Sequence, residues 1–310
     1  MIQNLFSLSV LIGVSYSAIR LATPYLYAAL GETIGQRSGV LNLGVDGIML
    51  MGAFMAYYAT YLTGDPWLGV LAALITGALM GLLMAVISVT LQAEQGISGI
   101  GLYLFGLGLS SLLLKVLVGT PVAVTGFEPI PIPVLSQIPI IGSVLFDHNI
   151  LIYLAYVLVP VTAFLLARTN LGLKIRAVGQ NPQAADSLGV SVQGVRYATV
   201  ITGSALAGVA GASLSIGLLD IFQENITNGL GFIAVALVYF GHWRPRGVLF
   251  GALLFSAVSA LQMWIQLTQL PVPSEVAIML PYALTIIVLA LGARQVRQPQ
   301  ALAKPFERGE

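Results

Sequence analysis

The chain has 310 residues, a net charge of +1, and 8% charged against 57% hydrophobic residues. Soluble proteins carry about 25% charged residues, so one soluble core cannot hide this apolar surface and lipid must cover it. Apolar runs of about 18 residues or more recur, which suits helices that cross a bilayer and not the short alternating strands of a barrel. The absence of cysteine excludes disulfides and thiolate metal sites, and the net charge gives no case for binding nucleic acid. The predicted fold class is an all-α, polytopic helical membrane protein.

About nine membrane segments are predicted, within a range of 8–10. In chain order they are 5–30, 41–63, 67–91, 97–119, 149–167, 196–219, 226–241, 247–267 and 275–292. The first is too long, and lacks the basic start and cleavage site, for a signal peptide, so we expect it to remain. The 226–241 segment would reach only about 24 Å, so it is tilted, broken or partly re-entrant.

The basic residues predict the orientation. With nine alternating spans and a cytoplasmic C-terminus, 11 of the 13 lysine and arginine residues fall on the inside, and only Arg20 and Lys115 lie within apolar segments. This asymmetry is typical of cytoplasmic loops. We therefore predict one transmembrane domain over 1–310, with a cytoplasmic loop at 168–195 and a cytoplasmic tail at 293–310.

Three further passages carry weaker signals. The proline-rich loop 120–149 is predicted to be extended and outside, either as a connector or as a docking surface for an external partner. Small residues at 204–212 indicate close helix packing. The passages 35–44 and 241–251 share a basic turn followed by Gly-Val-Leu, which indicates either two related parallel halves or merely a common kind of turn.

The sequence lacks the patterns of catalysis. It has no phosphate loop, no His-Glu-x-x-His and no nucleophile elbow, and its two histidines stand alone. No catalytic residue, metal site or cofactor is predicted. Lys115 lies near a span end and can extend to the interface. Arg20 and Asp46 lie deeper and are opposite in charge, so we predict that they form an intramembrane pair.

The polar stretch from Arg176 to Val190 is predicted to hold a helix of about seven residues. Asn181 is a good N-cap, Pro182 suits the first helical position, and Gly189 supplies a left-handed end. A helix this short is not stable alone. It is either a capped turn between two spans or a projection, with Ala184 and Ala185 as its small face, that seats in a groove of a soluble cytoplasmic partner.

This stretch also carries a family resemblance. Gly172 to Pro182, followed by Ala184-Ala185 and Gly189-Val190, resembles the coupling-helix region of ABC-importer permeases of the branched-chain amino acid, ribose and nucleoside type. Ser38 to Ala53, and Gly231 to Ala236 with Trp243-Arg244-Pro245, are similar to motifs of the nucleoside or simple-sugar branch. The resemblance covers nearly the whole chain in order.

The resemblance implies a permease subunit in a prokaryotic inner membrane that moves a nucleoside or sugar-like solute inward by alternating access. The implied partners are a second, different permease (this chain resembling the shorter one), cytoplasmic subunits that bind ATP-Mg, and an external solute-binding protein. The residues expected to contact the ATPase are Gln180, Asn181, Pro182, Ala184, Ala185 and Gly189.

Polar or aromatic residues in apolar segments are the candidates for the solute path: Asn42, Ser98, Tyr103, Asn225 and Phe232. Related permeases often carry asparagine where Tyr103 stands, so this ring either stacks on the solute or simply packs. An ion-coupled secondary transporter is the alternative function, although few charged residues are available for an ion relay. An integral-membrane enzyme is a weaker alternative, because no catalytic set is present.

Overall fold

The computed structural model describes residues 8–139, 141–267 and 298–307, with scattered positions between 276 and 290 (276, 279–281, 283–284, 286–287 and 290). Its helices are α2 (Leu8–Arg37), α3 (Val45–Thr63), α4 (Pro66–Ala85), α5 (Gln95–Leu113), α6 (Ile141–Leu145), α7 (Ile150–Arg168), α8 (Asn170–Gln180), α9 (Pro182–Ser187), α10 (Val192–Ser215), α11 (Leu230–Phe240) and α12 (Pro245–Leu267). π-helical turns extend α4 over Val86–Thr90 and α5 over Leu114–Val118, and a 3-10 turn covers Leu135–Gln137. The strands β1 (Ile130–Pro131) and β2 (Asp147–His148) form a short antiparallel pair. The predicted all-α class is confirmed.

Most predicted segments correspond to long helices. Five helices are long and apolar enough to cross a membrane: Pro66–Thr90, Gln95–Val118, Ile150–Arg168, Val192–Ser215 and Pro245–Gln266. The helices α2 and α3 add 30 and 19 residues in the first two predicted segments. The predicted segment 275–292 lies largely outside the described residues, so the count of nine stays a prediction.

The first helix is longer than predicted. It continues from residue 30 to Arg37, because its polar residues there are buried and paired with each other. The Gln36 amide donates to Glu32 at 3.1 Å and its oxygen accepts the Trp243 indole N–H at 2.8 Å. The polar composition of this stretch therefore marks a buried helix end and not a loop.

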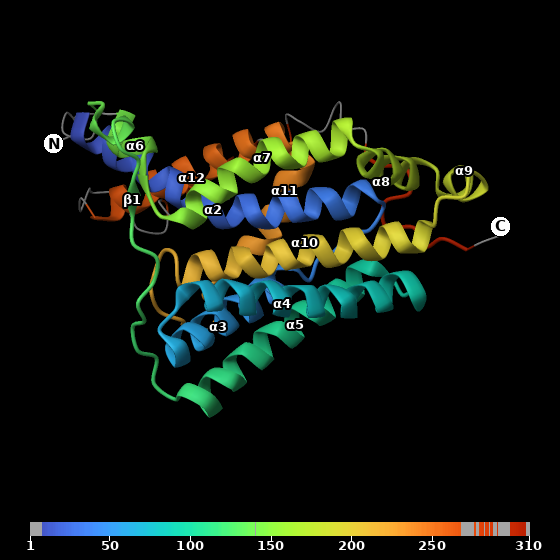
Figure 1. Ribbon diagram of the computed structural model, residues 1–310, viewed down its shortest axis with the longest axis horizontal. Helices are drawn as coiled ribbons and strands as arrows, with labels where there is room; N and C mark the ends of the chain where they lie inside the picture. The colour runs from blue at the N-terminus through green and yellow to red at the C-terminus, as the bar shows by residue number, and fades with distance from the viewer. Residues whose placement is uncertain are drawn as a thin grey trace.

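The centre of the bundle is α10. Figure 1 shows it running between α2 on one side and α3 and α4 on the other. It is largely buried, whereas α4, α5, α7 and α12 expose most of their surfaces, where lipid or partner chains can cover them. Gly203 of α10 meets Gly31 of α2, and Gly208 meets Gly52 of α3, so close that a methyl group would overlap the opposite backbone. The small residues at 204–212 therefore act as predicted, by letting helices approach closely.

Two helices begin inside the bundle. The chain turns back after α2 and runs without helix over residues 38–44, where the Asn42 amide lies 3.4 Å from the hydroxyl of Ser204, midway along α10. After α10, residues 216–229 are again non-helical, and α11 then has only 11 residues, about 16 Å. Of the alternatives for 226–241, the broken span is the one observed.

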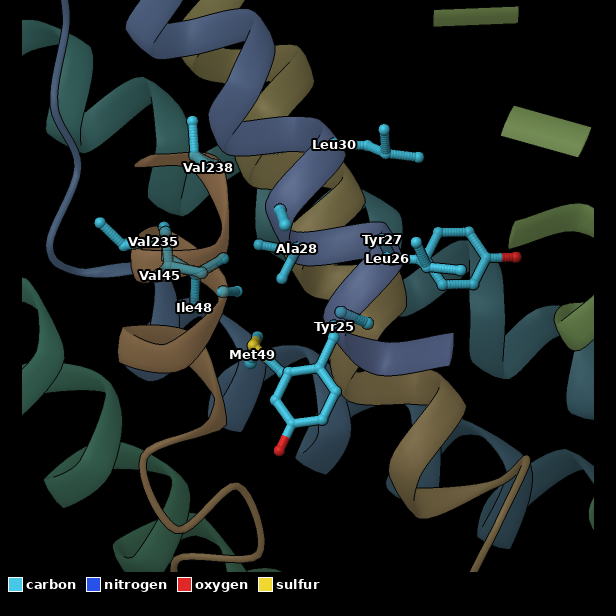
Figure 2. Close-up of a cluster of buried hydrophobic side chains, with 14 of the residues drawn as sticks. Tyr25, Leu26, Tyr27, Ala28, Leu30, Val45, Ile48, Met49, Val235 and Val238 are labelled. Carbon is cyan, nitrogen blue, oxygen red and sulfur yellow. The ribbon is translucent and has the colours of Figure 1, made fainter. Parts of the chain in front are cut away.

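A large apolar cluster holds these interrupted helices to α2. Figure 2 shows side chains of α2, including Tyr25, Leu26 and Leu30, together with residues of α3 and α11. Ile48 of α3 and Val238 of α11 are both fully buried in it. Because lipid is as apolar as these side chains, the cluster holds the half-length helices mainly through van der Waals packing.

The two ends of the bundle differ. The Leu8 end of α2 lies with β1 and α6, whereas α8, α9 and the segment 298–307 lie at the opposite end (Figure 1). The predicted extended loop 120–149 is mostly non-helical and carries the β1–β2 pair. The passages 35–44 and 241–251 both lie at the α8 end and contact each other through Gln36 and Trp243. They differ in shape, because residues 38–44 form a non-helical segment with turns at both ends, whereas α12 begins directly at Pro245.

The glycine contact between α3 and α10 can be tested by adding one methyl group. Gly52→Ala places its Cβ against the backbone of Gly208, and overpacking of this kind costs about 1–3 kcal/mol. We expect a lower apparent melting temperature of the detergent-purified protein. Gly108→Ala is the matched control, since no atom lies within 4 Å of its Cβ position. A Gly52→Ala protein that melts no earlier than the control contradicts the close contact.

Candidate functional site

A polar cavity lies where α2, the segment before α11 and α12 meet. Its volume is about 480 Å³, within the range of small-molecule sites. Its hydrogen-bonding side chains are Thr227, Asn228, Ser259, Gln262 and Gln266, and its apolar walls include Leu21, Pro24, Ile233 and Phe255. The cavity can therefore offer both amide and hydroxyl groups to a small polar solute.

The polar side of α12 follows from its sequence spacing. Ser259, Gln262 and Gln266 are separated by three and four residues, which places them on one face of the helix. All three line the polar cavity. We did not select them from the sequence, although polar residues at helical spacing inside an apolar span are a signal that could have found them.

Asp46 joins the starts of the two interrupted helices. One carboxylate oxygen accepts the Gly231 N–H at 2.7 Å, and the other accepts the Thr227 hydroxyl at 3.0 Å. Asp46 is fully buried. The first N–H groups of a helix have no partner within the helix and favour a negative charge, so Asp46 satisfies the start of α11. It also fixes Thr227, a wall of the polar cavity.

The predicted pair between Arg20 and Asp46 is wrong. Among the described residues, the salt bridge with a nitrogen–oxygen distance below 4.0 Å joins Lys115 and Glu224, at 3.1 Å, and involves neither Arg20 nor Asp46. The Arg20 guanidinium lies 5.7 Å from the Tyr16 ring centre. Burial raises the pKa of Asp220, and the positive charge of Arg20 opposes that shift. Arg20 therefore lies near the Ser215 end of α10, whereas Asp46 finds its partners at the start of α11.

The structure places the five predicted path residues outside the lining of the polar cavity. Asn42 is buried against α10, Ser98 donates to the Glu94 carbonyl at 2.6 Å, and Asn225 is exposed. Tyr103 and Phe232 do come together, with ring centroids 5.1 Å apart in an edge-to-face contact. The packing alternative for Tyr103 is thus observed, and stacking on a solute stays a prediction.

The polar stretch at 168–195 forms two helices, not the single one predicted. Thr169 caps α8 by accepting the Gly172 N–H at 3.0 Å, and Asn181 caps α9 by accepting the Ala184 N–H at 3.0 Å. Gly189 has φ +81°, the left-handed end expected from the sequence. The helix α8 has 11 residues and is not among the predicted helices. Thr169, a residue type that favours the N-cap position, is the sequence signal that could have predicted its start.

The predicted small face of α9 is divided between inside and outside. Ala185 is buried against Val178, Val192 and Phe306, whereas Ala184 is exposed. The exposed set, which we term the α9 surface, is Gln180, Asn181, Gln183, Ala184, Ser187, Leu188 and Gly189. Leu188 is an apolar side chain at the end of the molecule and is 85% exposed, so none of the described residues covers it.

The α9 surface is firmly joined to the bundle. Gly179, at the end of α8, lies so close to the Arg37 carbonyl of α2 that any side chain would overlap it. The Ala301 N–H donates to the Gly179 carbonyl at 3.0 Å, which ties in the C-terminal segment. Arg37 in turn donates to the Trp243 carbonyl at 2.9 Å, in the turn before α12. A force on α9 can thus reach both α2 and α12, two walls of the polar cavity.

These features define a multi-pass helical membrane protein with an internal polar site and a projecting surface at one end. A family model confirms and narrows this class. Residues 15–289 match the family described as branched-chain amino acid transport system / permease component, and the chain belongs to this family. No solved structure matches the chain.

Several relatives are similar along most of the chain. A putative glucose ABC transporter permease, TsgC13 of Haloferax volcanii, is 41% identical over 81% of this chain and 77% of its own length. The nucleoside ABC transporter permease NupC of Lactococcus lactis is 35% identical over 90% and 92%. The guanosine ABC transporter permease NupQ of Bacillus subtilis is 33% identical over 93% and 94%.

All three organisms also have a second, more distant permease relative, which in Haloferax volcanii is the glucose permease TsgB13, 26% identical to this chain. In Bacillus subtilis it is the guanosine permease NupP, which is 27% identical to this chain. In Lactococcus lactis it is the nucleoside permease NupB, which is 25% identical. Such transporters thus have two related permeases, of which this chain is more similar to NupQ and NupC.

The role of Asp46 can be tested with two variants. Asp46→Leu leaves the Gly231 N–H and the Thr227 hydroxyl buried without an acceptor, and each such group costs about 1–3 kcal/mol. Asp46→Asn keeps one carbonyl oxygen for Gly231, and the Thr227 hydroxyl can instead accept. We expect the leucine variant to melt well below the asparagine variant in detergent. Equal melting of both variants and the wild type would show that Asp46 does not hold α11.

Proposed function

We propose that this chain is a permease subunit of an ABC importer that carries nucleosides, or related sugar-containing solutes, inward across a prokaryotic inner membrane. The observation that carries the proposal is the path of contacts from the exposed α9 surface, through Gly179 and Arg37, to the helices that line the polar cavity. The sequence has no phosphate loop of its own. Energy therefore comes from a partner ATPase that binds ATP-Mg.

The polar cavity suits a nucleoside-like cargo. Its amide and hydroxyl groups can bond to ribose hydroxyls or base edges, and its apolar walls can cover the flat ring. Similarity to the NupQ and NupC permeases, whose names specify guanosine and nucleosides, supports this solute class. The matching sugar permease TsgC13 supports the wider class of sugar-containing solutes.

A second permease completes the path in this proposal. The paired permeases of Bacillus subtilis and Lactococcus lactis support a partner that is a different, related chain. The partner faces the polar cavity, and an external binding protein delivers the solute to the end that carries β1 and β2. The end with α8, α9 and the C-terminal segment faces the cytoplasm, in agreement with the distribution of basic residues.

Alternating access follows from the contacts already described. Movement of a bound ATPase displaces α8 and α9 together, because Gly179 and the segment at Ala301 leave no free joint between them and α2. Pro24 inside α2 lies at the cavity, and a proline lets a helix bend at that level. The cavity walls on α2 and α12 then move relative to Asp46 and the start of α11, which the Asp46 carboxylate holds.

Reconstitution tests this function directly. The complete transporter in vesicles, with its binding protein, is expected to accumulate radiolabelled guanosine only when ATP is present on the α9 side. A complex in which the partner ATPase cannot hydrolyse ATP is the control. Uptake driven by an ion gradient, by this chain alone and without ATP, would overturn the proposal in favour of an ion-coupled secondary transporter.

The α9 surface provides a prediction about coupling. Ala184→Asp and Leu188→Ser alter exposed positions, so we expect normal insertion and melting. In contact with an ATPase groove, the new carboxylate is buried without a partner, which costs several kcal/mol. ATP-driven uptake should fall at least about tenfold, while ATP hydrolysis continues.

The matched control is Leu62→Ser, since Leu62 is 62% exposed at the far end of α3. This variant should transport normally. Normal uptake by both α9 variants would show that the ATPase docks elsewhere on the chain.

The polar cavity gives a separate prediction. Gln262→Leu removes an amide from its wall, and the loss of one or two hydrogen bonds to solute costs about 1–3 kcal/mol. We expect the KM for uptake to rise about tenfold, while ATPase coupling and melting are unchanged. Gln137→Leu, an exposed glutamine outside the cavity, is the control. An unchanged KM in the Gln262 variant would place the path elsewhere.

A further inference from the structure

A second, larger cleft lies at the Pro245 end of α12, the end away from the polar cavity, between α7, α8 and the turn that precedes α12. Its volume is about 1,130 Å³. Five arginines line it, and we term it the basic cleft: Arg37, Arg168, Arg176, Arg244 and Arg246. They come from four separate parts of the chain, so the clustering is made by the fold and not by one basic run in the sequence.

The arginines of the basic cleft lack negative partners. None of the described residues that line the cleft is an aspartate or a glutamate. Among the described residues, the salt bridge with a nitrogen–oxygen distance below 4.0 Å joins Lys115 and Glu224, outside the cleft. Arg37 and Arg176 donate to backbone carbonyls, at 2.9 Å and 3.3 Å. Arg176 and Arg244 are close enough to act electrostatically on Arg37. Like charges gathered without acids favour the binding of an anion.

The other half of the basic cleft is apolar. Phe164 of α7 is 64% exposed and Phe250 of α12 is 69% exposed, with Val159 and Leu249 beside them. These residues belong to helices long and apolar enough to cross the membrane. A ligand that fills the cleft therefore needs a negative group at the arginines and a hydrocarbon part that follows α7 and α12 into the bilayer.

We propose that the basic cleft binds an anionic phospholipid. The headgroup phosphate bonds to the guanidinium groups of Arg168, Arg244 and Arg246, since arginine forms paired hydrogen bonds with phosphate oxygens. An acyl chain lies against Phe164 and Phe250. A soluble anion accounts for the arginines but not for the exposed phenylalanines. An acidic protein segment would not reach along helix faces within the bilayer, whereas lipid is present there at all times.

The site also has a place in the mechanics of the chain. Arg176 lies on α8, and Arg244 lies in the turn tied to Arg37. A phosphate held at Arg244 also reduces the repulsion that Arg244 and Arg176 exert on Arg37, and so favours the close approach of α8 to the start of α12. The lipid thereby stabilises the joint through which the α9 surface connects to the bundle.

The test uses the full chain purified in a mild detergent. Native mass spectrometry measures the retention of dioleoyl-phosphatidylglycerol against dioleoyl-phosphatidylcholine, which have the same acyl chains. We expect the wild type to retain phosphatidylglycerol preferentially, and high salt to reduce the preference. The variant Arg168→Gln/Arg244→Gln/Arg246→Gln, at three exposed positions, is expected to lose the preference by at least about tenfold.

Lys174→Gln is the matched control, because Lys174 is an exposed base on α8 that does not line the cleft. It should keep the preference of the wild type.

Melting without lipid checks the fold of each variant. The single variants Arg168→Gln and Arg246→Gln replace the triple variant if the triple variant melts early. Retention that is equal for both lipids, or unchanged in the arginine variants, overturns the proposal. Displacement of phosphatidylglycerol by inorganic phosphate at equal concentration also overturns it, since the site would then bind a free anion.

Discussion

A helix that starts inside a membrane protein exposes backbone N–H groups where no water is available, and such groups must find partners within the protein. In this chain the carboxylate of Asp46 provides that partner for α11, through the Gly231 N–H and with Thr227 beside it. Without this junction, the start of α11 after the non-helical segment 216–229 would be unsupported in the interior. Because the polar cavity borders the same place, the junction also decides where hydrogen-bonding groups can face a solute.

Close packing supplies the rigid frame around this junction. The helix α10 carries glycine, alanine and serine where it crosses α2, α3 and α4, so the backbones approach without side chains between them. Such contacts gain little from apolar transfer, since lipid is as apolar as the helix surface, and depend instead on fit. The transport cycle proposed above requires α2 with Pro24 and α12 with its glutamines to move as cavity walls, and this rigid centre would be the fixed part against which they move.

Local signals made part of this structure predictable from the sequence. The caps at Asn181 and Gly189 depend on a few neighbouring residues, so the start and end of α9 followed from residue types. Hydropathy predicted the long helices because it also depends only on residues that are neighbours in the sequence. The polar end of α2 lies beyond the predicted segment 5–30, because Glu32 and Gln36 find their partners in each other and in Trp243, more than 200 residues away.

The residues of the candidate site were harder to predict, because residues far apart in the sequence come together only where the interrupted helices α3 and α11 begin. Asp46 looked like the counterpart of Arg20 on grounds of charge, but a backbone N–H at a helix start has no mark in the composition. The exposed Leu188 was overlooked in favour of the alanines beside it, since burial of Ala185 depends on Phe306, far along the chain. The regular spacing of Ser259, Gln262 and Gln266 was visible, and it shows that polar periodicity within a span carries information even where total polarity is low.

The docking of the C-terminal segment has a consequence for biogenesis. Ala301 and Ala303 donate to the carbonyls of Gly179 and Gly39, and the Lys304 and Phe306 carbonyls accept from Arg196 and Gln92. These residues leave the ribosome after every helix that they hold. In the proposed orientation this end faces the cytoplasm and reaches its finished shape only late in synthesis, so a partner ATPase would meet the complete α9 surface only after membrane insertion of the chain.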